Sequence, residues 1–448
     1  GGYRLGYHSP RFVVKSCDCY YNTRDKVEPE SDLWRDLADR IERDEIDCVV
    51  HIGDNVYNDT DYCDIEKGKK VGQYTADEDC KWNIARKFVV NLPPQQWPTA
   101  IEQVREVFRA AYRETWAHPP AAFAFANCPN LMIFDDHEVR DDWGDRPGDK
   151  DRSSLDWFLA SQCYFVICEY QRVLFEDTAL PVQWSPQTWP RQTFYFQVFG
   201  DVGVYMQDIR GCKSFHYNEQ TDLQFPMMGA HQWSEFERAL SPGGVFSQCR
   251  ILIVAGPEPF AYATTKATQL GAKVIDDMYG HWMAEKHVPE MKRFLHAVFM
   301  WREQAPLGVR DVVLLGGDVH EGGWTRILHN GEDYDFQRDS MQQLTASAMS
   351  YHLRTNIQQL VSAGTKNTGD DLTNDFKFRH YQWTSLCNYG IVQCFQGELG
   401  EATYEGKLVA GGARECYERS VSHPDYDPHF GEDAIFEARD IAKSCCVQ

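Results

Sequence analysis

The sequence has no apolar run long enough to cross a membrane, and it is poor in positive charge. The longest apolar stretches, such as residues 157–168, fall short of the roughly 20 apolar residues of a membrane-spanning helix. Only 45 of the 448 residues are Lys or Arg, against 67 Asp and Glu, which gives a net charge of -22. The first feature argues against a transmembrane anchor. The second repels polyanions and argues against stable binding to duplex nucleic acid.

Several common sequence signatures are also missing. The chain contains no Gly-x-Ser-x-Gly nucleophile motif, and segment 400–407 has the wrong spacing for a phosphate-binding loop. No repeat, glycine-serine linker or low-complexity block divides the chain. We therefore expect a single domain over residues 1–448, with long surface loops at 58–98 and 140–153 and a cysteine-containing C-terminal tail.

Cysteine, by contrast, is abundant, with 15 residues. In an oxidising compartment most of them would form disulfide bonds, which predicts a protein that is secreted or held in a secretory organelle. The alternative is a set of unpaired, partly buried thiols in a reducing cell. No signal-peptide pattern precedes the first strand-like run, so we expect that any such peptide has been removed or never existed. One N-x-[ST] sequon begins at Asn58 and is compatible with secretion.

Apolar runs alternate with helical patterns along most of the chain. Runs rich in branched residues predict buried strands at 11–15, 46–52, 130–134, 194–206, 250–255, 311–315 and 390–395. Apolar residues three and four positions apart predict helices near 31–45, with Ser31 as the start, and near 99–116, 152–176, 231–240 and 288–302. This alternation indicates an α/β architecture with mainly parallel core strands and more antiparallel character near 380–410.

Three of the predicted strands end in acidic or histidine side chains. VVHIGDNVY places Asp54 after a glycine, and LMIFDDHEVRDD places Asp136 beside His137. VVLLGGDVH places Asp318 and His320 two residues apart, on one face if the extended conformation continues. Ligands of open α/β sheets bind at the carboxyl ends of strands. A turn or a helix cap could explain each segment alone, but the three together predict a metal site.

Carboxylates and imidazoles of this kind suit the hydrolysis of a phosphate ester. The reaction needs a hydroxide at neutral pH, and two cations about 3.5–4 Å apart lower the pKa of a bound water and clamp the phosphate. Hard oxygen ligands and imidazole complete the coordination of such ions. Asp54 is the natural candidate for a carboxylate that bridges the two ions.

These segments resemble those of the PhoD-like alkaline phosphatases, within the calcineurin-like and purple acid phosphatase group of metallophosphoesterases. The matching segments, in family order, are RFVVKSC (11–17), HIGDNVY (51–57), FRAAY (108–112), IFDDHEV (133–139), QDIR (207–210), DDMYGHW (276–282) and GGDVH (316–320). The resemblance implies one catalytic domain with a four-layer α/β/β/α sandwich, mixed sheets and metal ions at the strand ends.

The resemblance also implies the ligands of a first ion, which would be iron. Cys17 would be a thiolate ligand and Asp54 would bridge this ion to the second one. Tyr57 matches the tyrosinate position of purple acid phosphatases, with Tyr112 as the rival candidate. His320 would complete the shell.

The same comparison implies the second metal site and the proton donor. Asp318 and Asp136 would be ligands of the second ion, and His137 would stabilise the transition state or protonate the leaving oxygen. The chain departs from the family after this point, because Arg140-Asp141-Asp142 follows DDHEV where relatives usually have a pair of Asn. If Asp141 is a ligand, the second site is more anionic and favours calcium.

The expected ions follow from these ligands. A thiolate and a tyrosinate favour ferric iron, so Fe3+ with Ca2+ is the predicted pair, and Zn2+, Mg2+ or Mn2+ are the alternatives. Fifteen cysteines less Cys17 leave fourteen, an even number that could pair completely, and we expect Cys19 in a disulfide. Arg210 would either contact the phosphate or form a buried pair with Asp208.

The activity implied by the resemblance is hydrolysis of phosphomonoesters or phosphodiesters. Diesters are favoured, including phospholipids and polymeric phosphates, with an alkaline pH optimum. One alternative is a secreted metal-binding protein that has the same fold and no turnover. Another is a metal-dependent hydrolase of a non-phosphate ester.

Overall fold

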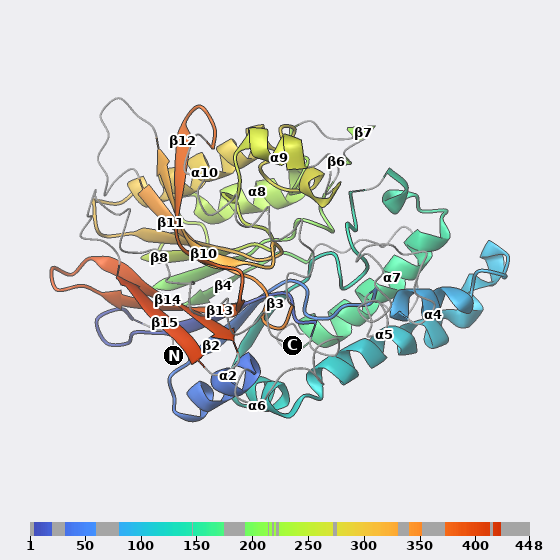
Figure 1. The fold of residues 1–448 in the computed structure, drawn as a ribbon. Coiled ribbons are helices and arrows are strands. Elements are labelled where there is room, and N and C mark those ends of the chain that lie inside the picture. Colours follow the sequence, from blue (N-terminus) through green and yellow to red (C-terminus); the bar gives the residue numbers. More distant parts are fainter. Residues whose placement is uncertain are drawn as a thin grey trace.

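Two β-sheets lie face to face, and helices pack on their outer sides (Figure 1). The structure is a computed structural model that describes residues 4–19, 32–59, 80–145, 147–173, 193–213, 215–216, 219–220, 224–271, 276–329, 340–351, 372–412 and 415–422. Segments far apart in the sequence meet in the first sheet, because a strand near residue 390 pairs with the first strand of the chain.

The first sheet carries the amino-terminal strands. Its order is β15 (Glu415–Ser422), β14 (Ala402–Gly412), β13 (Cys387–Gln396), β1 (Arg11–Lys15), β2 (Cys48–Ile52) and β3 (Asn130–Ile133). Strands β1, β2 and β3 are parallel, whereas β13, β14 and β15 are added antiparallel. The segments that follow β1, β2 and β3 therefore leave the sheet at one edge.

The second sheet has a parallel centre and antiparallel margins. Its order is β12 (Phe376–Thr384), β10 (Gly322–His329), β11 (Ser340–Ala346), β9 (Asp311–Gly316), β8 (Ile251–Ala255), β5 (Val202–Met206) and β4 (Tyr195–Phe199). Strands β11, β9, β8 and β5 are parallel neighbours. A mixed sheet with this parallel core brings four further strand ends to a common edge.

Helices fill most of the chain between the strands. Those on the first sheet are α2 (Leu33–Glu42) and α6 (Pro119–Asn127), and those on the second are α8 (Gly229–Leu240) and α10 (Val288–Glu303). The remaining elements are α4 (Lys81–Lys87), α5 (Ile101–Trp116), α7 (Leu155–Ile167), α9 (Thr265–Gly271), 3-10 turns at Pro94–Ala100, Pro147–Lys150 and Asp276–Tyr279, a π-helical turn at Cys168–Arg172, and the short hairpin of β6 (Phe215–His216) and β7 (Glu219–Gln220).

Helix α2 shows how the local sequence sets these elements. Asp32 caps its first turn, because its carboxylate accepts a hydrogen bond from Trp34 N at 3.0 Å. The predicted start at Ser31 is therefore one residue too early. Leu37 is fully buried beneath the helix, and burial of a leucine side chain contributes about 1.5–3 kcal/mol.

An apolar layer fills the space between the two sheets. Phe12 and Val14 of β1 point into it, together with Ile253 of β8. Val13 faces the opposite way and packs with α2, because successive side chains of a strand alternate between its faces. Leu252 likewise faces outward, towards α8 and α10. Helices, sheet, sheet and helices thus follow one another, and the predicted α/β fold with mixed sheets is confirmed.

The two predicted surface loops differ from expectation. Segment 58–98 contains helix α4 and part of a 3-10 turn in its described portion. Segment 140–153 folds into the interior, where Trp143 is fully buried and donates from Nε1 to Tyr164 Oη at 3.2 Å. Arg140 adds a buried ion pair with Asp149. Arg140, Asp142, Asp145 and Asp149 of this segment are thus buried, whereas Asp151 and Arg152 at its end are exposed.

The cysteines also differ from expectation. Free thiols are carried by Cys17, Cys48, Cys128, Cys163, Cys249 and Cys394, so the predicted disulfide pairing is wrong for the cysteines of this set other than Cys17. Each of them is buried, where a thiol packs as a small apolar group without needing a bridge. The C-terminal tail lies outside the described residues. Within the described residues, none of the helices has the length and apolarity needed to cross a bilayer.

Candidate metal centre

Side chains able to bind metal gather where the parallel strands end. Cys17 follows β1, Asp54 follows β2, Asp135 and Asp136 follow β3, and Asp318 follows β9. The first three strands belong to one sheet and β9 to the other, so the site lies where the edges of both sheets meet. The predicted location at the strand ends is thus where the structure places these residues.

The backbone at these positions is left-handed. Positive φ angles occur at Cys17 (54°), Asp54 (51°), Asp142 (56°), Asp318 (65°) and His320 (57°). A residue other than glycine in such a conformation costs about 1–3 kcal/mol and persists only where its surroundings impose it. The extended conformation expected from Asp318 to His320 is therefore wrong, and the two side chains separate into different groups.

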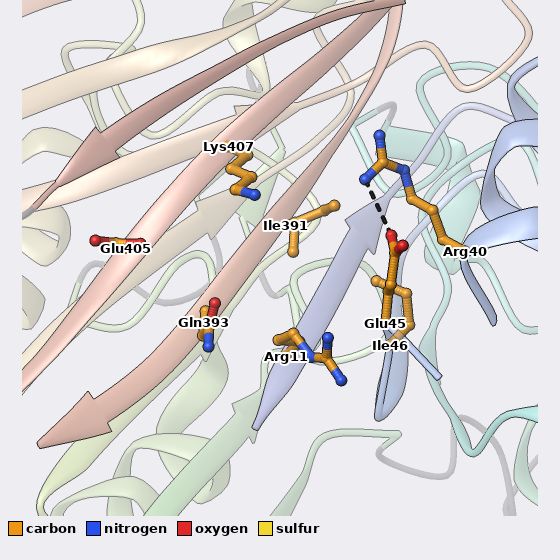
Figure 2. Close-up of a pocket in the computed structure, with 8 residues that line it drawn as sticks. All are labelled: Arg11, Arg40, Glu45, Ile46, Ile391, Gln393, Glu405 and Lys407. Carbon is orange, nitrogen blue, oxygen red and sulfur yellow. Dashed lines mark ion pairs between the residues drawn. The ribbon is translucent and has the colours of Figure 1, made fainter. Parts of the chain in front are cut away.

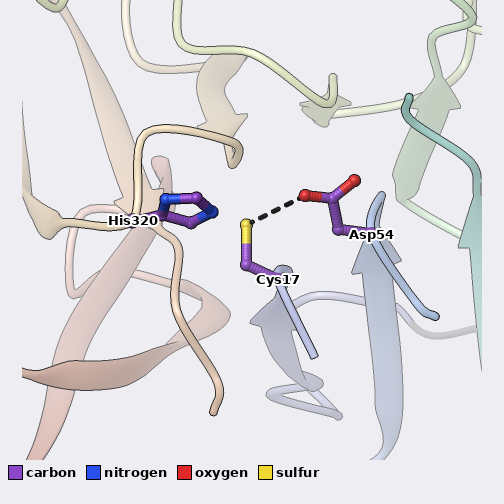
Figure 3. Close-up of side chains that lie close together, drawn as sticks. All are labelled: Cys17, Asp54 and His320. Carbon is purple, nitrogen blue, oxygen red and sulfur yellow. Dashed lines mark hydrogen bonds between the residues drawn. The ribbon is translucent and has the colours of Figure 1, made fainter. Parts of the chain in front are cut away.

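The first group contains Cys17, Asp54 and His320, which offer ligand atoms within 4.8 Å of one another. Figure 3 shows the Cys17 thiol pointing towards the Asp54 carboxylate, with Sγ to Oδ2 at 3.5 Å. Tyr57 Oη donates to the same Oδ2 at 2.9 Å and lies 3.3 Å from His320 Nε2. Tyr112 does not reach this group, because its hydroxyl accepts from Gln171 Nε2 at 2.9 Å.

The second group contains only carboxylates. Asp54, Asp135, Asp136 and Asp318 offer oxygens within 4.8 Å of one another. Asp135 Oδ2 and Asp136 Oδ1 are buried and make no hydrogen bond with the residues described. Asp54 therefore belongs to both groups, which is the geometry that a bridging carboxylate requires. A further set of nearby oxygens comes from Asp136, Asp141 and Asp142.

The protonation of these groups fits a site for cations. Burial raises the pKa of Asp54 and Asp135 well above 3.8, and repulsion from Asp136 adds to the effect, against the opposing charges of His137 and Arg210. Burial and the charge of Asp54 likewise raise the pKa values of Cys17 and Tyr57. A bound cation would replace these protons and relieve the repulsion.

His137 lies beside both groups and is held by a carboxylate. Its Nδ1 is 2.8 Å from Asp59 Oδ1, and its ring stacks on Tyr57 with centroids 4.1 Å apart. Asp59 belongs to the Asn58 sequon, whose asparagine is fully buried and donates to the carbonyl of Glu138. The sequon is thus part of the site, and its buried asparagine is inaccessible to glycosylation in the folded chain.

Glu138 ties two of the ligand-bearing turns together. Its Oε2 accepts from the backbone N–H of Asp54 at 3.1 Å and of Asp135 at 2.9 Å. Its Oε1 accepts from Asn55 N at 2.8 Å and from Gln171 Nε2 at 3.1 Å. Hydrogen bonds to a carboxylate contribute about 1.5–3 kcal/mol each, which is enough to offset the strain at Asp54. Glu138 stands in the matching segment 133–139, but nothing in the sequence assigned it this role.

A buried arginine balances the carboxylates of the second group. Arg210 has no exposed surface, and its Nε lies 2.6 Å from Asp135 Oδ1 and its Nη1 2.8 Å from Asp145 Oδ2. Its Nη2 is 3.4 Å from Glu258, a buried carboxyl whose pKa is raised to about 7 by burial. The expected pair with Asp208 is wrong, because the Asp208 carboxylate accepts from the backbone N–H of Arg210.

Two residues of the site were missed or undervalued by motif comparison. His281 Nε2 lies 3.1 Å from Asp318 Oδ2 and is almost fully buried. Tyr351 stacks on His320 with centroids 3.7 Å apart and on Tyr57 at 5.8 Å. His281 stands in the matching segment 276–282 but was assigned no role there, and Tyr351 stands in no matching segment, so only tertiary contact assigns these residues to the site.

A surface pocket at the opposite end of β1 offers a contrast (Figure 2). It is lined by Arg11, Arg40, Glu45, Ile46, Ile391, Gln393, Glu405 and Lys407. Arg11 lies 3.6 Å from Asp47, and Arg40 lies 3.0 Å from Asp36 and 3.5 Å from Glu45. Both arginines are thus already paired with carboxylates, whereas Asp135 Oδ2 and Asp136 Oδ1 of the strand-end site make no hydrogen bond with the residues described.

Comparisons with known proteins identify a family and a similar fold. The sequence model of a family described as PhoD-like phosphatase matches residues 12–397. A solved structure named "Structure of PhoD" has a similar fold, with a TM-score of 0.52 at 14% identity, over 93% of this chain and 72% of that chain. No curated protein sequence matches this chain.

Proposed function

Because the chain belongs to the PhoD-like phosphatase family, we propose that it hydrolyses phosphate esters with metal ions bound at the ends of its parallel strands. The observation that carries this proposal is the position of Asp54. It lies within one cluster of ligand atoms with Cys17 and His320 and within a second cluster with Asp136 and Asp318. A carboxylate shared by two clusters suits a pair of ions that act on one phosphate.

The two clusters would hold different ions. Cys17, Tyr57 and His320 supply sulfur, phenol and imidazole donors, which favour Fe3+, whereas Asp136 and Asp318 supply hard oxygens, which favour Ca2+. Zn2+, Mg2+ and Mn2+ remain the alternatives. Bound ions of this kind lower the pKa of a water and neutralise the charge of a phosphate.

The protein's own proton donor would be His137. Burial alone would lower its pKa, but the charges of Asp59, Asp136 and Asp54 outweigh burial and raise that pKa well above 6.5. Ions at Asp54 and Asp136 would cancel part of this effect, while the hydrogen bond to Asp59 would persist. Since Asp59 occupies Nδ1, Nε2 is the nitrogen left to protonate the leaving oxygen.

The finer aspects of the function belong to the same proposal. We expect diesters to be better substrates than monoesters, with phospholipids or polymeric phosphates as natural examples and an alkaline optimum. We also propose that residues 1–448 form one catalytic domain and that the protein is secreted or resides in a secretory organelle. The buried free thiols give no support to an argument for secretion from disulfide bonds.

The test compares three chromogenic esters with one leaving group. Purified protein is loaded with Fe3+ and Ca2+ and assayed with p-nitrophenyl phosphate, bis(p-nitrophenyl) phosphate and p-nitrophenyl acetate, with an Asp54→Asn variant and a chelator-treated sample as controls. Turnover of the phosphate esters that both controls abolish supports the proposal. Turnover of the acetate alone would favour a non-phosphate esterase, and metal binding without any turnover would favour a binding protein.

A further inference from the structure

The segment after β11 brings a serine hydroxyl between two members of the first group. Ser347 is fully buried, and its Oγ lies 3.1 Å from Cys17 Sγ. The same Oγ accepts a hydrogen bond from the backbone N–H of His320 at 2.8 Å. One hydroxyl thus contacts the sulfur and the turn that carries the imidazole. Ser16 Oγ also approaches the sulfur, at 3.3 Å, but it lies equally close to the carbonyl of Ala346.

The direction of the hydrogen bond to sulfur follows from the donors available. A cysteine that binds a metal ion is a thiolate and has no proton to donate. The N–H of His320 already points at a lone pair of the Ser347 oxygen, which leaves the hydroxyl proton for another acceptor. With Cys17 bound to an ion, that proton lies towards Sγ.

We propose that Ser347 is a positioning residue that donates a hydrogen bond to the Cys17 thiolate and fixes His320 against the same ion. The proposal rests on the assignment of Cys17 and His320 as ligands in the proposed function. A hydrogen bond to a coordinated thiolate draws electron density from the sulfur, so it weakens donation to the ion and tunes the ion's spectrum and redox potential.

The backbone holds Ser347 in place without help from its side chain. Its N–H donates to Glu321 O at 3.2 Å, and its carbonyl accepts from Asn388 Nδ2 at 2.6 Å. The next residue, Ala348, accepts from Asn388 N at 2.9 Å. Removing the hydroxyl therefore changes the contacts to Cys17 and His320 while the main chain keeps its anchors.

The chain offers a matched control in the same segment. Ser350 Oγ donates to Asp18 Oδ1 at 2.9 Å, and its backbone N–H lies 3.3 Å from the carbonyl of Cys17. Its hydroxyl bonds to Asp18 and not to the sulfur, so Ser350→Ala removes a hydroxyl of the same loop without removing the proposed interaction. Ser16→Ala should have an intermediate effect, because the Ser16 hydroxyl lies equally close to the sulfur and to the carbonyl of Ala346.

The test uses Co2+ as a coloured ion in the otherwise metal-free full chain. Absorption spectra report the thiolate-to-metal charge-transfer band, and competition with a chelator reports the Co2+ dissociation constant. We expect Ser347→Ala to shift the band to longer wavelength, because the sulfur regains electron density. The dissociation constant should rise about 10-fold, because the loss of the contacts that orient Cys17 and His320 outweighs the stronger donation from sulfur. Ser16→Ala should shift the band less in the same direction, and Ser350→Ala should leave it in place.

Two results would overturn the inference while leaving the proposed function intact. One is a wild-type band that does not move in Ser347→Ala, and the other is an equal shift in Ser350→Ala, which would assign the effect to loop packing. Absence of any thiolate band in the wild type would remove Cys17 as a ligand and the role of Ser347 with it. Ester hydrolysis, measured separately, decides whether the catalytic proposal survives that outcome.

Discussion

The two halves of the strand-end site differ in the kind of side chain that surrounds Asp54. On one side, Cys17, Tyr57 and His320 offer one donor atom each, and Tyr351 stacks on two of the rings. We call this side the aromatic half. On the other side, which we call the carboxylate half, Asp135, Asp136 and Asp318 offer oxygens within 4.8 Å of one another and of Asp54, and His137 forms a further close group with Asp54 and Asp136.

The halves also differ in how charge is balanced. The carboxylate half is faced by the buried guanidinium of Arg210, which contacts Asp135 at 2.6 Å and lies 3.9 Å from Asp136. The aromatic half relies on hydroxyl and phenol hydrogen bonds around the sulfur and Asp54. The two halves therefore offer ligands of different softness around one aspartate, so the ions that we propose for them would differ in chemistry.

Substitution of the shared residue should have the largest effect, because it breaks both halves at once. In Asp54→Asn, loss of the bridging charge should reduce ester hydrolysis by about 10³-fold or more, since metal ions supply several kcal/mol of transition-state stabilisation. Turnover and metal content are measured together. Asp151→Asn, at an exposed carboxylate, is the control. If Asp54→Asn kept both ions and most of its turnover, Asp54 would not be the ligand that bridges the two ions.

Loss of His137 should separate chemistry from metal binding in both halves. His137→Ala should lower kcat about 10²- to 10⁴-fold, the usual contribution of a general acid, while both ions remain bound. Asp59→Asn keeps the imidazole of His137 but weakens the hydrogen bond to Nδ1, so kcat should fall less than in His137→Ala. A leaving group of low pKa should restore part of the rate in His137→Ala, and a full rate with a poor leaving group would contradict the role.

Paired substitutions should tell the two halves apart by their ions. Cys17→Ser should weaken the binding of the ion in the aromatic half by more than the roughly 10- to 100-fold that is typical when a residue supporting a ligand is lost. Asp318→Asn should weaken the binding of the ion in the carboxylate half by a similar factor. Elemental analysis after limited chelation identifies the ion lost in each variant. Tyr57→Phe should change the colour of the iron-loaded protein, whereas Tyr112→Phe should not. Loss of the same ion from both variants would show that the halves are not distinct.

The smallest effect should come from a histidine that belongs to neither half. His380 Nε2 donates to the carbonyl of Tyr262 at 2.8 Å, and its Nδ1 lies 2.7 Å from Thr325 Oγ1. Burial lowers the pKa of this histidine to about 4. As pH falls from about 6.5 to 4, the unfolded chain gains a proton that the folded chain resists, so the free energy of unfolding should fall by about 3 kcal/mol.

The measurement is urea unfolding at pH 7 and near pH 4, with excess chelator present so that metal release does not contribute. In His380→Gln, the free energy of unfolding should fall by less than in the wild type between pH 7 and pH 4. An unchanged pH dependence in that variant would place the acid sensitivity in other groups.

Much of the fold was predictable because local patterns coincide with burial. The run 11–15 and the run 251–255 are strands with buried side chains, and the helices predicted near 99–116 and 288–302 lie within two residues of α5 and α10. The strands β10 and β11 were missed, since polar residues such as Thr325 and Gln343 interrupt their apolar pattern. Their hydrogen-bond partners come from other segments, so no local pattern records their burial.

The sequence by itself determined which residues stand at the strand ends. Cys17, Asp54, Asp136, Asp318 and His320 each follow a strand-like apolar run, and parallel strands end at a common edge. The choice between Tyr57 and Tyr112 was left open, because both are aromatic residues in matching segments. The hydroxyl of Tyr57 is the one that reaches Asp54.

Only the tertiary structure decided how those residues divide around Asp54. The left-handed turns at Asp318 and His320 send two neighbouring side chains to different groups, which an extended reading of the sequence could not anticipate. Ser347, Glu138 and Arg210 act on the site from three separate segments. Side-chain hydrogen bonds and charge compensation depend on distances across the fold, whereas strand and helix patterns depend on neighbours along the chain.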